Sequence, residues 1–282
     1  MIFLTRISNR FTSKKSCCER LLARSLTSLE LTNSQIEDDF TRHAYKESGI
    51  LYEHHIPTSL LQKGLLAVGS GVAAFFDPTR DDMIAVLGES TGYYALKKIR
   101  RLMQLDKEGQ KILRERPRIT SATINVPALR ELPEGTFGKE YTNFLDRNKV
   151  TPDSRLPVRF IDDPELAYVM QRYREVHDFN HALLGMPTNI VGEITVKWFE
   201  MVQTRLPMCT FGSLLAPLRL KRSQQERLVN TYIPWALYAG YRARFLMNLY
   251  VEKYFEEPID LLRKRLNIVS PPIATKRTKK QM

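Results

Sequence analysis

The chain has 282 residues, 43% of them hydrophobic, so it is long enough to bury a core and lacks the composition of a disordered protein. Its formal net charge is +12, but much of the excess lies at the two ends of the chain. Those basic residues need not belong to the folded surface, so we expect no nucleic-acid partner. No run reaches the ~18 apolar residues of a membrane-spanning helix.

Residues 1–29 have the composition of a mitochondrial transit peptide. They contain six Lys or Arg and one acid, many Ser and Thr, and spaced Ile, Leu and Phe. An ordinary solvated tail is the alternative. Cys17 and Cys18 lie in this segment, which leaves Cys209 alone in the remainder. We therefore expect no disulfide, and we interpret Cys209 as a small core residue rather than a nucleophile.

The rest of the chain divides by composition into a polar linker (30–56), a helical domain (57–268) and a basic tail typical of disorder (269–282). Near the start of the domain lies an apolar, small-residue segment, Gly64–Phe76. It is too short to span a membrane. We expect a buried helix there, and the alternative is a segment that dips into a membrane interface.

Helical periodicity continues through the first half of the domain. A turn over residues 77–81 separates two helices, and residues 93–116 follow with apolar residues at helical spacing and a basic opposite face. Residues 117–159 are rich in Pro and Gly, and we expect only a short helix there, near 141–147.

The next two helices have clear start and stop signals. Asp163-Pro164 provides an N-cap and a proline at the first helical position, and the periodic pattern continues to Leu184. Gly185 fits the position that ends this helix, and Pro187 restarts one that continues over residues 191–204. So short a connection predicts an antiparallel helix hairpin.

Residues 218–267 are helical in period and rich in aromatic side chains, and Pro234 should kink or interrupt this part. No convincing alternation of period two occurs anywhere in the chain. The sequence therefore predicts an all-α fold, a multi-helix bundle.

Four polar groups of the hairpin have the spacing of a metal site. His177 and His181 continue the apolar stripe of the first helix, one turn apart, so both point into the bundle. Asp178 stands about 100° round that helix, and the returning helix brings Glu193 level with the histidines. A divalent cation would compensate the buried acids. Two nitrogens and two oxygens favour Zn²⁺, although Fe, Mn or Co could also bind. A hydrogen-bonded cluster or a solvated helix end is the alternative.

The same residues carry a family resemblance. HDxxH is followed after eleven residues by Glu, within LGMPTNIVGEITVKWFE, and FIDDPELAYVMQRYREVHD precedes it. Together with AVLGESTG, LPEGTFGKEY and QTRLPMC, these motifs resemble the ubiquinone (coenzyme Q) biosynthesis protein of the Coq-four family. The resemblance covers roughly residues 60–268.

The resemblance implies a helical lyase that removes the C1 carboxyl of a polyprenylated hydroxybenzoate intermediate. It implies a divalent metal held by His177, Asp178, His181 and Glu193, which are also the expected catalytic residues. It further implies a peripheral protein on the matrix side of the inner mitochondrial membrane, in a multi-subunit complex with the other ubiquinone-biosynthesis enzymes, and it admits a homodimer. We expect Gly64–Phe76 and the aromatic C-terminal helices to line a groove for the prenyl tail.

Two other functions compete with this interpretation. A non-catalytic scaffold that binds prenyl lipid would explain the basic and aromatic surfaces but not four inward-pointing ligands. An HD-type metal phosphohydrolase could combine His177 and Asp178 with His54 or His55 and with an acid such as Asp260.

Overall fold

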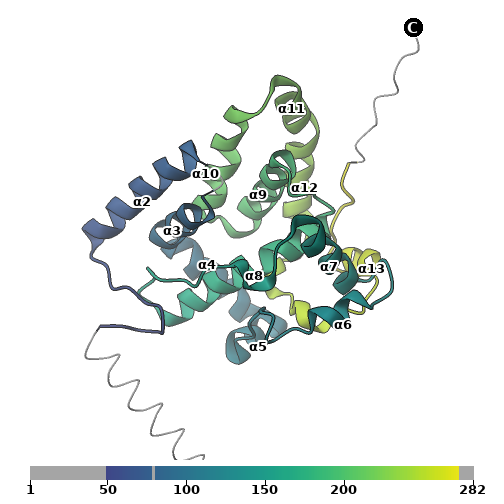
Figure 1. The fold of residues 1–282 in the computed structure, drawn as a ribbon, viewed down its shortest axis with the longest axis horizontal. Coiled ribbons are helices and arrows are strands. Elements are labelled where there is room, and N and C mark those ends of the chain that lie inside the picture. The colour runs from purple at the N-terminus through teal and green to yellow at the C-terminus, as the bar shows by residue number, and fades with distance from the viewer. Residues whose placement is uncertain (1–48, 78–79, 273–282) are drawn as a thin grey trace, which may run out of the picture. The chain divides into compact units, whose positions relative to one another are not determined.

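The computed structural model describes residues 49–77 and 80–272, and the chain divides after Glu53 into two units. All the helices considered below belong to the second unit (Figure 1). Apart from one isolated bridge between Thr136 and Pro258, the described residues form helices and loops only, which confirms the all-α prediction.

Several predictions concern residues outside this description. The structure does not describe the predicted transit peptide (1–29) or residues 30–48 of the predicted linker. It also does not describe Pro78-Thr79 in the predicted turn or residues 273–282 of the predicted tail. The predicted segment boundaries therefore stay predictions. Within the described residues, no helix is both long and apolar enough to cross a membrane.

The first helix, α2 (Leu60–Phe76), begins where Ser59 and Gln62 form a capping box. It packs against α3 (Asp81–Thr91), and Ser70 is its one buried residue. The prediction of a buried helix is therefore wrong, because α2 has a neighbour on one side only. Many of its other apolar side chains are exposed, above all Leu60, Leu61, Leu65, Val68, Val72 and Phe76.

The segment predicted as one helix over 93–116 is two helices. α4 (Tyr93–Leu105) ends before Asp106, whose side chain accepts hydrogen bonds from the first backbone N–H groups of α5 (Lys107–Glu115). Aspartate at an N-cap starts a new helix where the hydrophobic period alone indicated continuation. The following residues form more helix than predicted, with α6 over Val126–Arg130 and α7 over Phe137–Asn148.

The central helix is α8 (Pro164–Leu184), in which every residue from Leu166 to Leu184 is buried. As predicted, Asp163 caps its start and Gly185 ends it, with a φ of 63° that favours glycine. The next helix, α9 (Ile190–Thr204), begins at an Asn189 cap rather than at the proline before it.

The C-terminal part is more broken than its periodicity indicated. It contains α10 (Pro207–Leu215), α11 (Arg222–Arg227), a π turn (Leu228–Tyr232), α12 (Ile233–Arg242) and α13 (Ile259–Arg265), together with three 3-10 turns (Ala216–Arg219, Leu246–Asn248 and Val251–Lys253). Pro234 lies in the first turn of α12, where its missing N–H costs little.

Gly192, in the first turn of α9, tests how tightly the connection before that helix is packed. A Cβ there would lie 2.0 Å from the carbonyl oxygen of Pro187. We expect Gly192→Ala to lower the free energy of unfolding by about 1–3 kcal/mol, because the backbone must shift. Gly64→Ala is the matched control, since a Cβ there meets nothing within 4 Å. Urea unfolding should show the control unchanged or up to about 1 kcal/mol more stable; equal losses for both would contradict the prediction.

Candidate metal centre

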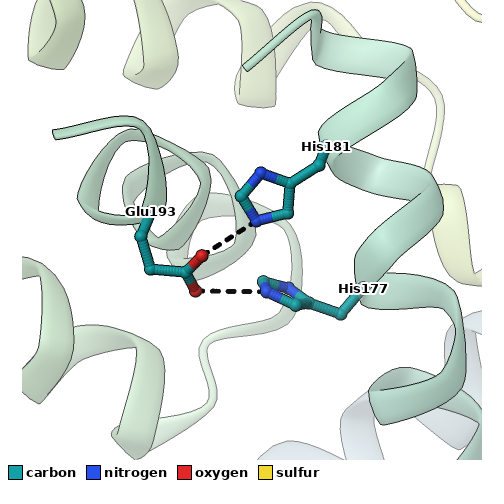
Figure 2. A group of neighbouring side chains, drawn as sticks. All are labelled: His177, His181 and Glu193. Carbon is teal, nitrogen blue, oxygen red and sulfur yellow. Dashed lines mark hydrogen bonds and ion pairs between the residues drawn. The ribbon is translucent and has the colours of Figure 1, made fainter. Parts of the chain in front are cut away.

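Three side chains converge where the last turns of α8 meet the first turn of α9. His177 and His181 extend from α8, and Glu193 extends from α9 between them (Figure 2). The Nε2 atom of His177 lies 3.1 Å from one Glu193 oxygen, and Nε2 of His181 lies 2.9 Å from the other. One ligand atom from each residue lies within 4.8 Å of the other two. The predicted meeting of the two helices at these residues is therefore confirmed.

The other ring nitrogens hold both imidazoles in place. Nδ1 of His177 donates to Glu200 at 2.7 Å, and Nδ1 of His181 donates to the backbone carbonyl of Met186 at 3.1 Å. Metal-binding histidines are usually oriented by such acceptors, which place the proton on the nitrogen away from the ion. Both Nε2 atoms thus face the same point.

The charges of the cluster suit a cation. Burial alone lowers the pKa of His177, but the carboxylates of Glu200 and Glu193 outweigh it and raise the pKa to about 9. Burial favours the neutral form of Glu193, yet the two histidines hold the pKa of its carboxyl well below its ordinary value. In the metal-free state the proton on Nε2 of His177, which faces Glu193, therefore occupies the place that a metal ion could take.

The geometry also fits a metal. Nε2 of His181 is buried and has no hydrogen-bond partner among the described residues, because the nearby Glu193 oxygen lies outside hydrogen-bonding geometry. Ligand atoms around a tetrahedral Zn²⁺ are separated by roughly 3.4 Å, close to the distances found here. Two imidazoles and a carboxylate can hold such an ion and leave a coordination position open.

Asp178, the fourth predicted residue, does not join the other three. It is buried, but its carboxylate accepts a hydrogen bond from Nη2 of Arg155. Its position about 100° round the helix from His177 points it to a different neighbour. A role for Asp178 as a metal ligand stays a prediction.

A buried polar network behind His177 was missed from the sequence. Glu200 also accepts from the Tyr173 hydroxyl at 2.6 Å and from the Lys197 ammonium at 3.0 Å. Glu193, Lys197 and Glu200 follow one another at spacings of four and three residues, so they share one side of α9. That spacing was visible, but nothing in it showed that the side faces the histidines.

The remaining candidate residues lie elsewhere or are inert. Burial raises the pKa of the Cys209 thiol to about 12, in keeping with the core interpretation. His55 lies 2.9 Å from Asp162, and Asp260 pairs with Arg263 at 2.9 Å. Neither His55 nor Asp260 belongs to the cluster, so these two residues give a phosphohydrolase no support.

One cavity adjoins the cluster, and a second shares part of its lining. The smaller, of about 100 Å³, is lined by His177 and Glu193 themselves. The larger, of about 680 Å³, lies between α2 and α3 and is mainly apolar. They share three lining residues, namely Ala85, Leu156 and Arg174. Part of Gly64–Phe76 lines the larger cavity, as predicted, but none of its lining residues comes from the aromatic C-terminal helices.

Comparison with known proteins agrees with the motif around these residues. Residues 52–272 match the model of the family described as coenzyme Q (ubiquinone) biosynthesis protein Coq4. The chain belongs to this family. The predicted resemblance is therefore confirmed.

Relatives of the Coq4 family match over most of their length. The proteins named ubiquinone biosynthesis protein COQ4 homolog, mitochondrial, from Homo sapiens and Bos taurus are each 56% identical to this chain over 226 residues, which cover 80% of this chain and 85% of the relative. The Aedes aegypti protein of that name is 48% identical over 231 residues, 82% of each chain. A crystal structure from Nostoc punctiforme has a TM-score of 0.61 at 21% identity, covering 76% of this chain and all of the other. The latter likeness concerns the fold alone.

Metal uptake by this Coq4 family member should release a proton. Since the pKa of His177 is raised to about 9, its ring is protonated at pH 7.5, and it must lose a proton to bind a metal. Calorimetric titration of Zn²⁺ into metal-free protein, in buffers of different ionisation enthalpy, should show about one proton released per site at pH 7.5 and fewer above pH 9. Zn²⁺ binding without proton release at pH 7.5 would contradict this.

Glu200 should support metal binding without contacting the ion. We expect Glu200→Gln to weaken Zn²⁺ binding about 10–100-fold in competition with a chelator, because the amide no longer holds the Nδ1 proton of His177 as strongly. Glu226→Gln serves as control, since Glu226 lies on α11, away from the cluster, and pairs with exposed Arg222. Wild-type affinity in Glu200→Gln would show that the hydrogen bond does not orient the ligand.

Proposed function

We propose that the protein acts in ubiquinone biosynthesis as a metal-dependent lyase that removes the C1 carboxyl of a polyprenylated 4-hydroxybenzoate intermediate. The observation that carries the proposal is the convergence of His177, His181 and Glu193 at a small cavity that shares lining residues with a larger apolar one. Membership of the Coq4 family supports the pathway. The cluster supports the chemistry, since three ligands with an open position suit a catalytic rather than a structural metal.

The reaction breaks the bond between C1 and the carboxyl group. Both electrons of that bond stay on the ring, CO₂ leaves, and a proton takes its place at C1. A bound divalent cation, with Zn²⁺ favoured by the donor set, would stabilise the negative charge on the ring and its phenolic oxygen.

The chain's own residues prepare the site for this step. His177, His181 and Glu193 would hold the ion, and Glu200 orients the first of these rings. Asp178 stands apart from the three, which suits a proton carrier better than a ligand.

The larger cavity would hold the prenyl tail. Leu65 and Leu66 of α2 and Met83 and Val86 of α3 provide apolar walls. Leu65 is 67% exposed, so the cavity opens at the surface. A tail bound there would have its aromatic end toward the smaller cavity and the metal cluster.

The outward side of α2 supports a peripheral position on the inner mitochondrial membrane, on the matrix side. Leu60, Leu61, Val68 and Phe76 are all more than half exposed there. An apolar helix side of this kind suits the interface of a bilayer. Relatives named as mitochondrial support the compartment. The other ubiquinone-biosynthesis enzymes remain the proposed partners.

A non-catalytic scaffold that binds prenyl lipid is the second candidate. The exposed apolar side chains of α2, together with Phe211, Leu214 and Leu218 near α10, favour it, because such surfaces suit partner proteins as well as lipid. A variant without the metal ligands separates the two candidates: a scaffold would assemble its complex and sustain ubiquinone synthesis without them.

Turnover of a short-tailed prenyl-4-hydroxybenzoate by metal-reconstituted protein tests the lyase. We expect CO₂ release from the C1 carboxyl, lowered at least about 100-fold in His177→Ala, because the ion loses a ligand and its position. Running the assay with and without O₂ distinguishes protonation at C1 from oxidation there. His54→Ala, outside the cluster, is the matched control. Unchanged turnover in His177→Ala, with no stoichiometric metal in the purified protein, would overturn the proposal.

A further inference from the structure

Three arginines line the two cavities, and one of them, Arg174, lines both. Arg159 and Arg174 line the larger cavity, and Arg155 and Arg174 line the smaller. Burial lowers the pKa of Arg174, and the positive charges of Arg155 and Arg159 lower it further. Like charges gathered in a partly buried place are unfavourable unless anions compensate them. Glu89 compensates Arg174 through a hydrogen bond of 2.9 Å.

The cations that line the smaller cavity differ in how many of their donors are used. The Lys197 ammonium donates to Glu200 at 3.0 Å and to the Tyr173 hydroxyl at 3.3 Å, and Glu193 lies 3.9 Å away, so carboxylates of the chain already compensate its charge. Arg155 is different. Its Nη2 donates to Asp178, while its buried Nε has no hydrogen-bond partner among the described residues. Its side chain is 30% exposed and lines the smaller cavity, so part of it is open to an incoming group.

We propose that Arg155, beside Arg174, binds the carboxylate of an aromatic acid whose apolar tail occupies the larger cavity. The proposal rests on the proposed function and deepens it, because it assigns the residue that recognises the acid group of the substrate. A guanidinium presents two parallel N–H donors that match the two oxygens of a carboxylate. Arg155 can keep Asp178 on one edge and offer its remaining donors to the ligand.

Arg155 lies where the aromatic head group of the ligand would be held, between the cavity for its apolar tail and the metal cluster. Leu156, the next residue, lines both cavities, so a ligand passing from one to the other meets this segment. The smaller cavity also contains His177 and Glu193. With the carboxylate on Arg155, the open position of the cluster stays available for the phenolic oxygen on the same ring.

Binding measurements on full-length, metal-loaded protein test the proposal without relying on catalysis. The probes are farnesylated 4-hydroxybenzoate, the corresponding farnesyl phenol without the carboxyl, and farnesyl phosphate. We expect wild type to prefer the acid over the phenol by about 10–100-fold, as for a charge-assisted bidentate contact. Arg155→Gln should remove this preference and leave phenol affinity unchanged. Arg155→Lys keeps a charge opposite Asp178 and should retain part of the preference, and it serves if the Gln variant fails to fold.

Arg130→Gln is the matched control, because Arg130 makes a comparable pair with Asp146 at 2.7 Å on the surface. Equal losses of acid and phenol affinity in Arg155→Gln would overturn the proposal, since they indicate a structural role only. Equal wild-type affinities for acid and phenol would overturn it too, as would an effect of Arg155→Gln on the phosphate alone. An acid preference that depends on Arg155 without any CO₂ release would uphold the carboxylate site and reject the lyase.

Discussion

The hydrogen bond between Nδ1 of His177 and Glu200 is the contact on which the candidate centre depends. It places the proton on the ring nitrogen away from Glu193, and so directs Nε2 to the point where His181 also aims. Glu200 can do this because Lys197 and Tyr173 hold it in turn. Without these partners, burying the carboxylate of Glu200 would be costly.

The burial of α8 explains why so many charged pairs surround it. A helix enclosed on all sides cannot leave its polar residues in water, so each needs a partner from another element. Arg172 forms a bidentate pair with Glu252. Glu175 pairs with Arg118, and Arg174 pairs with Glu89. At the candidate metal centre the paired groups of α8 are His177 and His181, and with Glu193 they can also bind a cation.

Helix α8 contributes to both cavities of the proposed reaction, the larger apolar cavity and the smaller cavity at the metal cluster. Arg174 lines both cavities, with apolar residues of α2 and α3 on one side and the His/His/Glu cluster on the other. A ligand with a charged aromatic head and an apolar tail matches this arrangement. The exposed side of α2 then places the open end of the larger cavity beside the surface best suited to a membrane.

Local signals were enough to predict the caps of α8, its end at Gly185, the shared side of His177 and His181, and the return of Glu193, because each depends on helical spacing or on a few adjacent residues. Contacts between distant segments were not predictable in this way. The pairing of Asp178 with Arg155, the support from Glu200 and the exposure of α2 all follow from which helix surfaces meet. A periodic pattern shows that a helix has an apolar side, but it does not show what covers that side, and packing between remote elements settles that.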